Sequence, residues 1–334
     1  MIGDIGKKME LIVVDDGSTD GSSDVAERWM REHEHLLLPS LLLQQSHSGA
    51  AAARNRALAS ANGEYIWFVD ADDEVTADSL RRLLPLLTTY HPTRFLKTGP
   101  MWPAVSSQPH PLSDEACDRR QPLSSVWDLL QPRSSGLDHT TYIFNTAFLK
   151  EHHLAYPTAL SLLEDSSFVL SVLQTTADRE GADGRIDAAC CFFPDFRPYL
   201  FHADTRSTTQ GRWDRDRSHT FTDNICTFFS QLRRVAEQVD RRNVWDCLDR
   251  YVYVYLRVMT VKDCPWDDIR RFRQCIATPD GTLYHTPQTG LARLLANPTA
   301  HRILQFLCKI LQPLRLPLKK MRQAHRRTKQ HQNQ

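Results

Sequence analysis

Two short apolar segments that each run into a cluster of acidic residues constrain the fold of this chain most. Residues 11–14 (LIVV) lead into residues 15–20 (DDGSTD), and residues 65–69 (YIWFV) lead into residues 70–73 (DADD). Apolar runs of this length, rich in β-branched and aromatic residues and bounded by polar loops, predict buried strands. Acidic side chains are therefore expected where both strands end.

The residues around these strands predict helices that alternate with them. We expect helices at residues 24–34, 49–61 and 77–89, and a further strand at residues 41–45. Strands that alternate with helices indicate an open α/β sheet.

The rest of the chain gives weaker local patterns. Residues 92–132 are rich in proline and serine and predict a loop with little regular structure, and order resumes at residues 142–149. Ser161 and Glu164 have the spacing of a capping box, so we expect a helix to open there. From residue 214 onward the pattern is helical.

Composition bounds the class of protein. The net charge of +1 gives no reason to expect nucleic acid as a partner, and a hydrophobic share of 41% is ordinary for a soluble globular protein. None of the eight cysteines forms a CxxC pair, which predicts reduced thiols and a cytoplasmic location. The most apolar stretches, residues 36–43 and 303–318, are too short or too interrupted to span a bilayer.

Residues 315–334 form a basic tail, with seven Lys or Arg and no acidic residue. The tail has three interpretations. It is a solvated chain end, or it attaches weakly to an anionic membrane surface at about 1 kcal/mol per basic residue. Nucleic-acid binding is disfavoured because no aromatic residue is interleaved from Met321 onward. We expect a cytoplasmic protein whose tail can contact the inner face of the membrane.

A calcium loop competes with ligand binding as an interpretation of the first acidic segment, and a solvated turn rich in capping residues is a third. An EF-hand needs an entering helix, whereas residues 11–14 predict a strand, and its normally apolar eighth position is Ser23. Its positions 1, 3, 5, 6 and 12 would be Asp16, Ser18, Asp20, Gly21 and Glu27. At a strand end of an open α/β sheet, a carboxylate can instead bind a pyrimidine base or a ribose.

The second acidic segment places two carboxylates two residues apart, at Asp70 and Asp72. Such a pair can face a divalent cation that in turn holds a diphosphate. Acidic turns and helix caps produce the same pattern, so it is weak alone. A phosphatase motif is excluded because Glu74 stands where Thr or Val is needed.

In combination, four segments closely resemble the pattern of family 2 glycosyltransferases with the GT-A fold. They are residues 14–22 (VDDGSTDGS), 53–58 (ARNRAL), 63–66 (GEYI) and 70–73 (DADD). The resemblance runs from about residue 10 to about residue 87 and resumes more faintly near residues 164 and 199–209. It implies an α/β fold with an open, mostly parallel sheet flanked by helices and a helical C-terminal region.

The resemblance also implies three regions and four donor-side roles. The regions are a nucleotide-sugar-binding half (1–92), an acceptor side (93–211) and a helical part with the basic tail (212–334). By position, Asp16 looks like the residue that reads the base of a UDP-type donor, and Arg54 like the cation beside the nucleotide. Asp70 looks like the ribose contact, and Asp72 resembles the ligand of a Mn²⁺ or Mg²⁺ ion.

Residues 163–168 (LEDSSF) resemble the acceptor-site motif of the family, in which the aspartate, here Asp165, is the general base. An inverting transfer needs one carboxylate to take the proton of the attacking hydroxyl. The competing interpretation is that Glu164 and Asp165 only cap a helix.

Residues 199–202 (YLFH) and 206–209 (RSTT) resemble the later basic and hydroxyl segment of the family. His202 would complete the metal shell or touch the diphosphate, and Arg206 would neutralise phosphate charge. A surface histidine without a catalytic part is the alternative for His202. His47 is interpreted as a loop residue.

Family members open with a strand that ends in Pro-x-Tyr-Asn and a helix, whereas only nine residues precede Glu10 here. A strand, a crossover and a helix need roughly thirty residues. We therefore expect the opening strand to be missing and the chain, expressed alone, to be marginally folded or aggregated.

The expected activity is metal-dependent, inverting transfer of a sugar from a nucleotide-diphosphate donor to a hydroxyl of a saccharide or lipid-linked acceptor. Surface polysaccharide or lipopolysaccharide synthesis is the setting that the resemblance implies. The alternatives are a truncated, inactive remnant that only binds nucleotide-sugar and, more weakly, a calcium-binding module.

Overall fold

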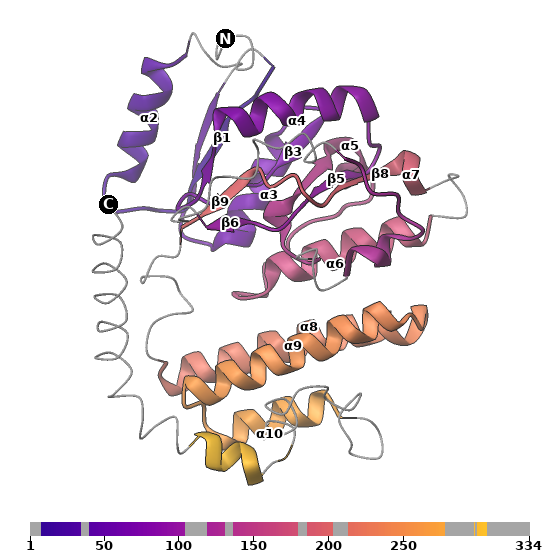
Figure 1. Cartoon of the computed structure of the whole chain (residues 1–334). Coiled ribbons are helices and arrows are strands. Elements are labelled where there is room, and N and C mark those ends of the chain that lie inside the picture. Colours follow the sequence, from indigo (N-terminus) through magenta and orange to yellow (C-terminus); the bar gives the residue numbers. More distant parts are fainter. Residues whose placement is uncertain are drawn as a thin grey trace, which may run out of the picture. The chain divides into compact units, whose positions relative to one another are not determined.

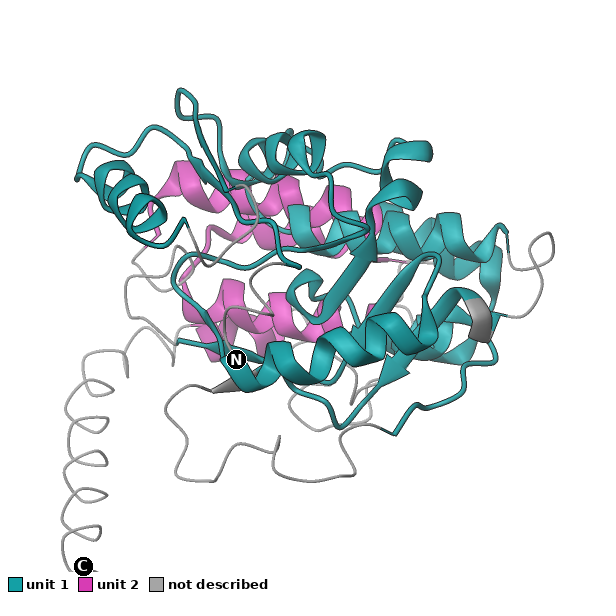
Figure 2. Cartoon of the chain, turned by 90° about the horizontal axis from the view of Figure 1, so that it is seen from above, with its two compact units in different colours: residues 1–210, 231–247 teal, residues 211–230, 248–334 magenta. Residues whose placement is uncertain are grey.

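The computed structural model describes residues 8–34, 40–103, 119–130, 136–179, 186–202, 213–277, 297 and 299–305. The chain divides into two compact units, which Figure 2 shows in different colours. Unit 1 comprises Met1–Gln210 and Gln231–Cys247, and unit 2 comprises Gly211–Ser230 and Leu248–Gln334. Residues 231–247 thus belong to unit 1, and the three predicted regions remain a prediction.

The first half of unit 1 alternates strands and helices as the sequence predicts (Figure 1). The elements are β1 (Ile12–Asp15), α2 (Ser22–Glu32), β2 (Leu41–Gln44), α3 (Ala50–Ser60), β3 (Tyr65–Trp67), β4 (Glu74–Val75) and α4 (Ala77–Tyr90). The α/β class is confirmed.

The second half of unit 1 adds strands and short helices to this framework. The elements are β5 (Phe95–Thr98), β6 (Trp102–Pro103), η3 (Val126–Leu130), η4 (His139–Thr141), β7 (Tyr142–Asn145), α5 (Thr146–Glu151), α6 (Glu164–Ala177), α7 (Ile186–Ala189), β8 (Cys190–Phe193) and β9 (Tyr199–Phe201). The prediction of a loop over residues 92–132 is wrong at β5, which is fully buried inside a four-stranded sheet.

The described strands form three sheets, in the orders β1-β2, β3-β7-β5-β8 and β4-β9-β6. Three pairings are parallel (β1–β2, β5–β8, β6–β9) and three are antiparallel (β3–β7, β5–β7, β4–β9). The expectation of a mostly parallel sheet is therefore corrected to a mixed sheet. The reason is that β7 pairs antiparallel with the earlier strands β3 and β5, and β9 pairs antiparallel with the earlier strand β4.

Helices cover both faces of the four-stranded sheet because its strands alternate in period two. Leu96 of β5 lies opposite Ile143 of β7, and both belong to the apolar cluster with the leucines of α4. Phe95 and Phe144, the next pair along, face the opposite side, where Phe144 meets Phe168 of α6 at 5.3 Å between ring centroids. The sheet thus lies between α4 and α6.

The β1–β2 sheet is less protected than the four-stranded sheet. All residues of β1 are only partly buried, whereas β5 and β8 are fully buried. Among the described strands, β1 pairs with β2 alone, and β3 pairs with β7 alone. The absence of an opening strand, with its effect on stability, stays a prediction.

Unit 2 is helical, as expected from residue 214 onward. Its helices are α8 (Arg215–Val239) up to Ser230, α9 (Arg242–Val261) from Leu248, and α10 (Trp266–Cys275). Phe229 of α8 packs against Tyr255 of α9 and Phe272 of α10, at 5.9 and 5.1 Å between ring centroids. Within the described residues, no helix is both long and apolar enough to cross a membrane.

Candidate active site

Asp16 holds the loop that leads into α3. Its carboxylate accepts hydrogen bonds from Gln45 Nε2 at 2.7 Å and from the backbone N–H groups of Ser48 and Gly49, both at 2.8 Å. His47 Nδ1 also lies 2.8 Å from it. Burial raises the pKa of Asp16, but these donors outweigh it and hold the pKa below its usual value. The carboxylate predicted to read a base therefore already binds protein donors, and the loop residue His47 lies beside it.

The close approach of this loop to β1 depends on Gly17. Its φ is +79°, in the left-handed region, and a Cβ added there would lie 2.9 Å from the backbone nitrogen of His47. Glycine is the residue that adopts this conformation without strain. The Asp-Asp-Gly motif thus lets Asp16 reach the start of α3.

Arg54 joins the donor-side and acceptor-side motifs. From α3 its guanidinium donates to Asp70 Oδ1 at 2.7 Å and to Glu164 Oε1 at 2.8 Å. Burial lowers the pKa of Arg54, but Asp70, Tyr156 and Glu164 outweigh burial and raise it. The structure thus brings together residues that the sequence places 94 positions apart (164 − 70).

Asp165 lies in the first turn of α6, beside this ion pair. Glu164 opens the helix, and Leu163 precedes it with a φ of 65° and no side-chain cap. The predicted capping box at Ser161 is therefore wrong, since the chain turns at Leu163 instead. Burial raises the pKa of Asp165, but His139, the Ser166 N–H and Arg54 outweigh it and lower the pKa. A carboxylate in the first turn is also favoured by the helix dipole.

The acidic loop after β3 is tied to β9 by Asp73. Its carboxylate accepts from Tyr199 Oη and from the backbone N–H of His202, both at 2.8 Å. Tyr199 Oη in turn accepts from the Asp70 N–H at 3.0 Å. Asp73 and Tyr199 hold the loop in place, whereas the exposed Asp72 makes no hydrogen bond or ion pair with another described residue.

His202 lies next to this loop, as its predicted role requires. Because β4 pairs antiparallel with β9, with Glu74 opposite Leu200, the residues before β4 and after β9 are neighbours. The His202 ring is 43% exposed and its Nε2 lies 3.5 Å from Glu74 Oε2. In the part of the chain that the structure describes, no three His, Cys, Asp or Glu side chains lie close enough to hold a metal ion. Arg206 lies outside the described residues.

Residues 4–102 match the family described as Glycosyl transferase family 2. This segment of the chain is thus similar to glycosyltransferase family 2. Its relatives include the uncharacterized glycosyltransferase YibD of Escherichia coli, 45% identical over 67 residues, which are 20% of this chain and 18% of YibD. The putative teichuronic acid biosynthesis glycosyltransferase TuaG of Bacillus subtilis is 40% identical over 78 residues, 23% of this chain and 30% of TuaG. The matched segments thus span less than a third of these relatives.

The likeness in fold extends over most of the chain. The crystal structure of residues 1–349 of Staphylococcus aureus TarS superposes with a TM-score of 0.59 at 18% identity, covering 94% of this chain and 86% of the other. A further structure of the same TarS fragment, in complex with UDP-GlcNAc, gives a TM-score of 0.58 at 17% identity. The GT-A architecture is therefore confirmed.

Sequence reasoning missed three residues that shape the candidate site. Tyr199 and Asp73 fix the acidic loop, and His139 lies buried between Asp70 and Asp165, with a ring nitrogen 3.8 Å from each carboxylate. The only pointer to Asp73 in the sequence is its adjacency to Asp72, the predicted metal ligand, in the segment of residues 70–73. His139 stands in no recognisable motif, so nothing in the sequence identified it.

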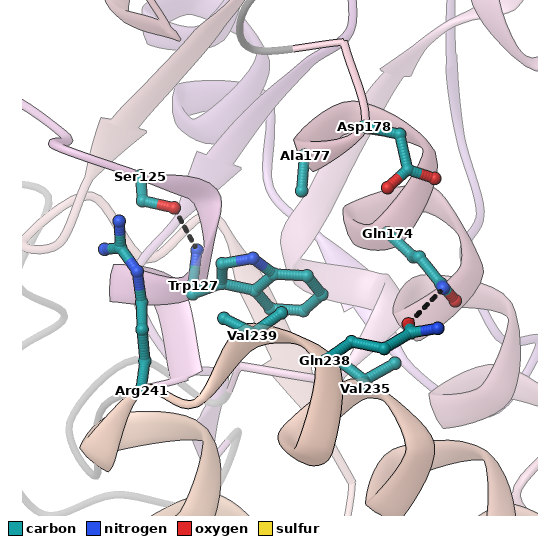
Figure 3. A pocket seen from close by; sticks show the side chains of 9 residues that line it. All are labelled: Ser125, Trp127, Gln174, Ala177, Asp178, Val235, Gln238, Val239 and Arg241. Atoms are coloured by element: carbon teal, nitrogen blue, oxygen red, sulfur yellow. Dashed lines mark hydrogen bonds between the residues drawn. The ribbon is translucent and has the colours of Figure 1, made fainter.

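A cavity in unit 1 lies near the C-terminal end of α6, whereas Asp165 lies in the first turn of this helix. It measures about 450 Å³ and is bordered by Trp127 of η3 and by Gln174 and Gln238, which hydrogen-bond at 3.3 Å (Figure 3). Gln174 is nine residues beyond Asp165, or about 13 Å along the helix at 1.5 Å per residue. None of the predicted site residues lines this cavity.

Proposed function

We propose that this chain transfers a sugar from a nucleotide-diphosphate donor, of the UDP type, to an acceptor hydroxyl with inversion at the anomeric carbon. The observation that carries the proposal is the double ion pair of Arg54 with Asp70 and Glu164. It joins the segment that resembles the donor site to the segment that resembles the acceptor site. A transferase needs both substrates at one place.

Asp165 is the proposed general base. Its lowered pKa keeps the carboxylate ionised at neutral pH, so it can accept the proton of the hydroxyl as the oxygen attacks the sugar. Its side chain is 33% exposed, which leaves it open to an acceptor. Arg54 is well placed to stabilise negative charge near the donor, although it would have to loosen one ion pair to do so.

A UDP-sugar is the donor class best supported, because the TarS fragment of similar fold is solved in complex with UDP-GlcNAc. In this chain, Asp16 and Asp70 would take the base and the ribose. The base of the donor would then replace Gln45 and the Ser48 N–H, which donate hydrogen bonds to Asp16 in this structure. Outside the described residues, Arg206 is a further proposed phosphate contact.

A Mn²⁺ or Mg²⁺ ion would be held by Asp72 and His202 together with the diphosphate. The exposed carboxylate of Asp72 and the half-exposed imidazole of His202 on adjoining segments fit this purpose, with most ligands left to the donor and to water. Such an ion neutralises charge on the departing diphosphate.

Synthesis of surface polysaccharide is the proposed setting, on a saccharide or lipid-linked acceptor. The names of two relatives support it: TuaG is a putative teichuronic acid biosynthesis glycosyltransferase, and TarS is a poly(ribitol-phosphate) β-N-acetylglucosaminyltransferase. TarS matches at 28% identity over 49% of this chain. A cytoplasmic location, with the basic tail at the inner face of the membrane and no nucleic-acid partner, completes the proposal. That tail lies outside the described residues.

An inactive chain that only binds nucleotide-sugar is the second candidate. The β1 strand, which is only partly buried and from whose end Asp16 extends, favours it. Binding of UDP-sugar without transfer or donor hydrolysis would identify this candidate.

The variant Asp165→Asn tests the proposed reaction. An amide cannot take the proton, so transfer from UDP-sugars should fall by about 10²–10⁴-fold while UDP affinity stays unchanged. Radiolabelled sugar transfer and calorimetric UDP binding measure the two quantities. Normal turnover by the variant would reduce Asp165 to a helix-terminal residue and move the base elsewhere.

A further inference from the structure

His139 is a buried histidine whose two ring nitrogens face two carboxylates of the proposed site. Nε2 lies 3.8 Å from Asp70 Oδ1, and Nδ1 lies 3.8 Å from Asp165 Oδ2. The side chain is only 3% exposed, and neither nitrogen has a hydrogen-bond partner among the described residues. Buried polar atoms without partners are uncommon, and each one calls for an explanation.

The protein fixes this ring firmly. Asp138 caps the η4 turn by accepting from the backbone N–H and the hydroxyl of Thr140, at 3.1 and 2.7 Å. Trp67 of β3 donates to the Thr140 carbonyl at 2.7 Å, so the turn is attached to the strand that leads to Asp70. The ring also packs edge-on against Phe68 and Tyr156, at 6.3 and 5.8 Å between centroids.

A structural role alone does not account for a histidine here. Each separation of 3.8 Å is too long for a hydrogen bond, and a shift of about 1 Å would close it. Site hydrogen bonds are often long before substrate binds and shorten in the complex. An apolar ring would fill the space without leaving two polar atoms unpaired.

The charges around Asp165 indicate why a hydrogen-bond donor is needed beside it. Glu164 on its own helix, Asp138 beside the ring and Asp70 across from it are all acidic. Arg54, the nearby cation, is already divided between Asp70 and Glu164. An N–H donor on His139 would supply the stabilising partner that these acidic neighbours cannot give to the Asp165 carboxylate.

We propose that His139 is a positioning residue that donates from Nδ1 to the general base Asp165 while its Nε2 faces Asp70 on the donor side. It fixes the direction of the base relative to the bound donor, and it keeps the base ionised. This inference rests on the proposed transferase function.

Substitution of His139 by asparagine or by glutamine distinguishes the role of Nδ1 from that of Nε2. The amide nitrogen of asparagine is two bonds from Cβ, as is Nδ1, and that of glutamine is three bonds away, as is Nε2. His139→Ala should lower kcat for sugar transfer by about 10–10²-fold, part of what a general base contributes, while the donor KM changes far less. His139→Asn should recover most of kcat, whereas His139→Gln should not.

A carboxyl titration tests the contact without any activity. Followed by ¹³C NMR, the pKa of Asp165 should rise by roughly 1 unit in His139→Ala, because a charge-stabilising neighbour within reach is lost. An unchanged pKa, or an asparagine variant no better in kcat than the alanine variant, would overturn the proposal. If wild-type protein transfers no sugar, the proposed function fails, and the titration alone still decides the role of His139.

His152→Ala is the matched control. Its Nε2 also lies 3.9 Å from a carboxylate, Glu151, at the end of α5 in the same unit. Its substitution should leave both kcat and the pKa of Asp165 unchanged. If His139→Ala does not fold, the asparagine and glutamine variants carry the comparison between themselves.

Discussion

The carboxylates of the site differ in what already occupies them. Asp16 accepts three hydrogen bonds and also lies 2.8 Å from His47 Nδ1, and Asp73 accepts two, whereas the exposed Asp72 has no hydrogen-bond or ion-pair partner among the described residues. A carboxylate with free lone pairs is the one that can serve a hard cation. Residue types alone could place these acids at strand ends, but only the fold separates the anchored ones from the free one.

Asp72→Ala should abolish metal-dependent donor binding, because one carboxylate supplies much of the protein's hold on the ion. UDP affinity, measured by calorimetry with and without Mn²⁺, should then show no metal effect. Asp78→Ala, which removes an exposed acid of α4, should retain it. An Asp72→Ala protein that still binds UDP more tightly with Mn²⁺ would remove Asp72 from the metal site.

Lys97, fully buried in β5, should make stability rise with pH. Burial lowers its pKa to about 7 in the folded protein, against about 10.4 in an unfolded chain, although Asp138 opposes the shift. Between these values the unfolded chain binds the extra proton, so the free energy of unfolding rises by up to about 1.4 kcal/mol per pH unit. Urea unfolding measures this slope.

Lys97→Met should flatten the slope, since methionine carries no proton. The surface lysine variant Lys150→Met, which loses hydrogen bonds to the Ala59 and Ala61 carbonyls, should keep it. An equal slope in wild type and Lys97→Met would show that Lys97 is charged in the folded protein.

At the scale of elements, the sheets contain both strands that the sequence predicted and a strand, β5, that it did not. The β1 to α4 region, apart from β4, was predictable because β1, β2 and β3 are apolar and alternate with helices. The β5 strand was not, because it is four residues long, lies within a proline-rich stretch and contains Lys97. The lysine is tolerated there because it donates to the Thr98 carbonyl and to Thr141 Oγ1, at 2.8 and 2.7 Å.

The β1–β2 pair should be the first part of the sheet to open. Its strands are only partly buried and share one ladder of four residue pairs, whereas β5 is buried and bonded on both edges. Amide hydrogen exchange should therefore be faster in Ile12–Asp15 than in Phe95–Thr98, because local opening needs less free energy where little apolar surface is buried. Equal protection of both strands would show that β1 has a partner outside the described residues.

At the scale of the whole molecule, unit 2 has a polar anchor of its own. Asp268 on α10 is fully buried and accepts from Ser218 Oγ at 2.8 Å, with His219 Nδ1 at 2.5 Å. Asp268→Ala should lower the free energy of unfolding by roughly 2–4 kcal/mol, because it leaves buried donors unpaired. Thermal denaturation measures the loss.

Asp267→Ala is the neighbouring control. Asp267 is 72% exposed and, among the described residues, pairs only with Arg270, at 3.4 Å, so its loss should cost less than about 1 kcal/mol. Equal destabilisation by both variants would show that the buried contacts of Asp268 are not what stabilises unit 2.

The ties made by the acidic loop and α3 also limit how this protein could be divided. Residues 4–102 match the family, yet Asp73 is held by Tyr199, Arg54 by Glu164, and Asn55 exchanges two hydrogen bonds with the backbone of Tyr156. Each partner lies beyond residue 102. Excised as a fragment, the matched segment would retain Asp16, Arg54, Asp70 and Asp72 and lose the groups that hold the acidic loop and α3 in place. The segment that matches the family is thus smaller than the part of the chain that positions its side chains, and a domain exchange between relatives would have to carry residues from both sides of residue 102.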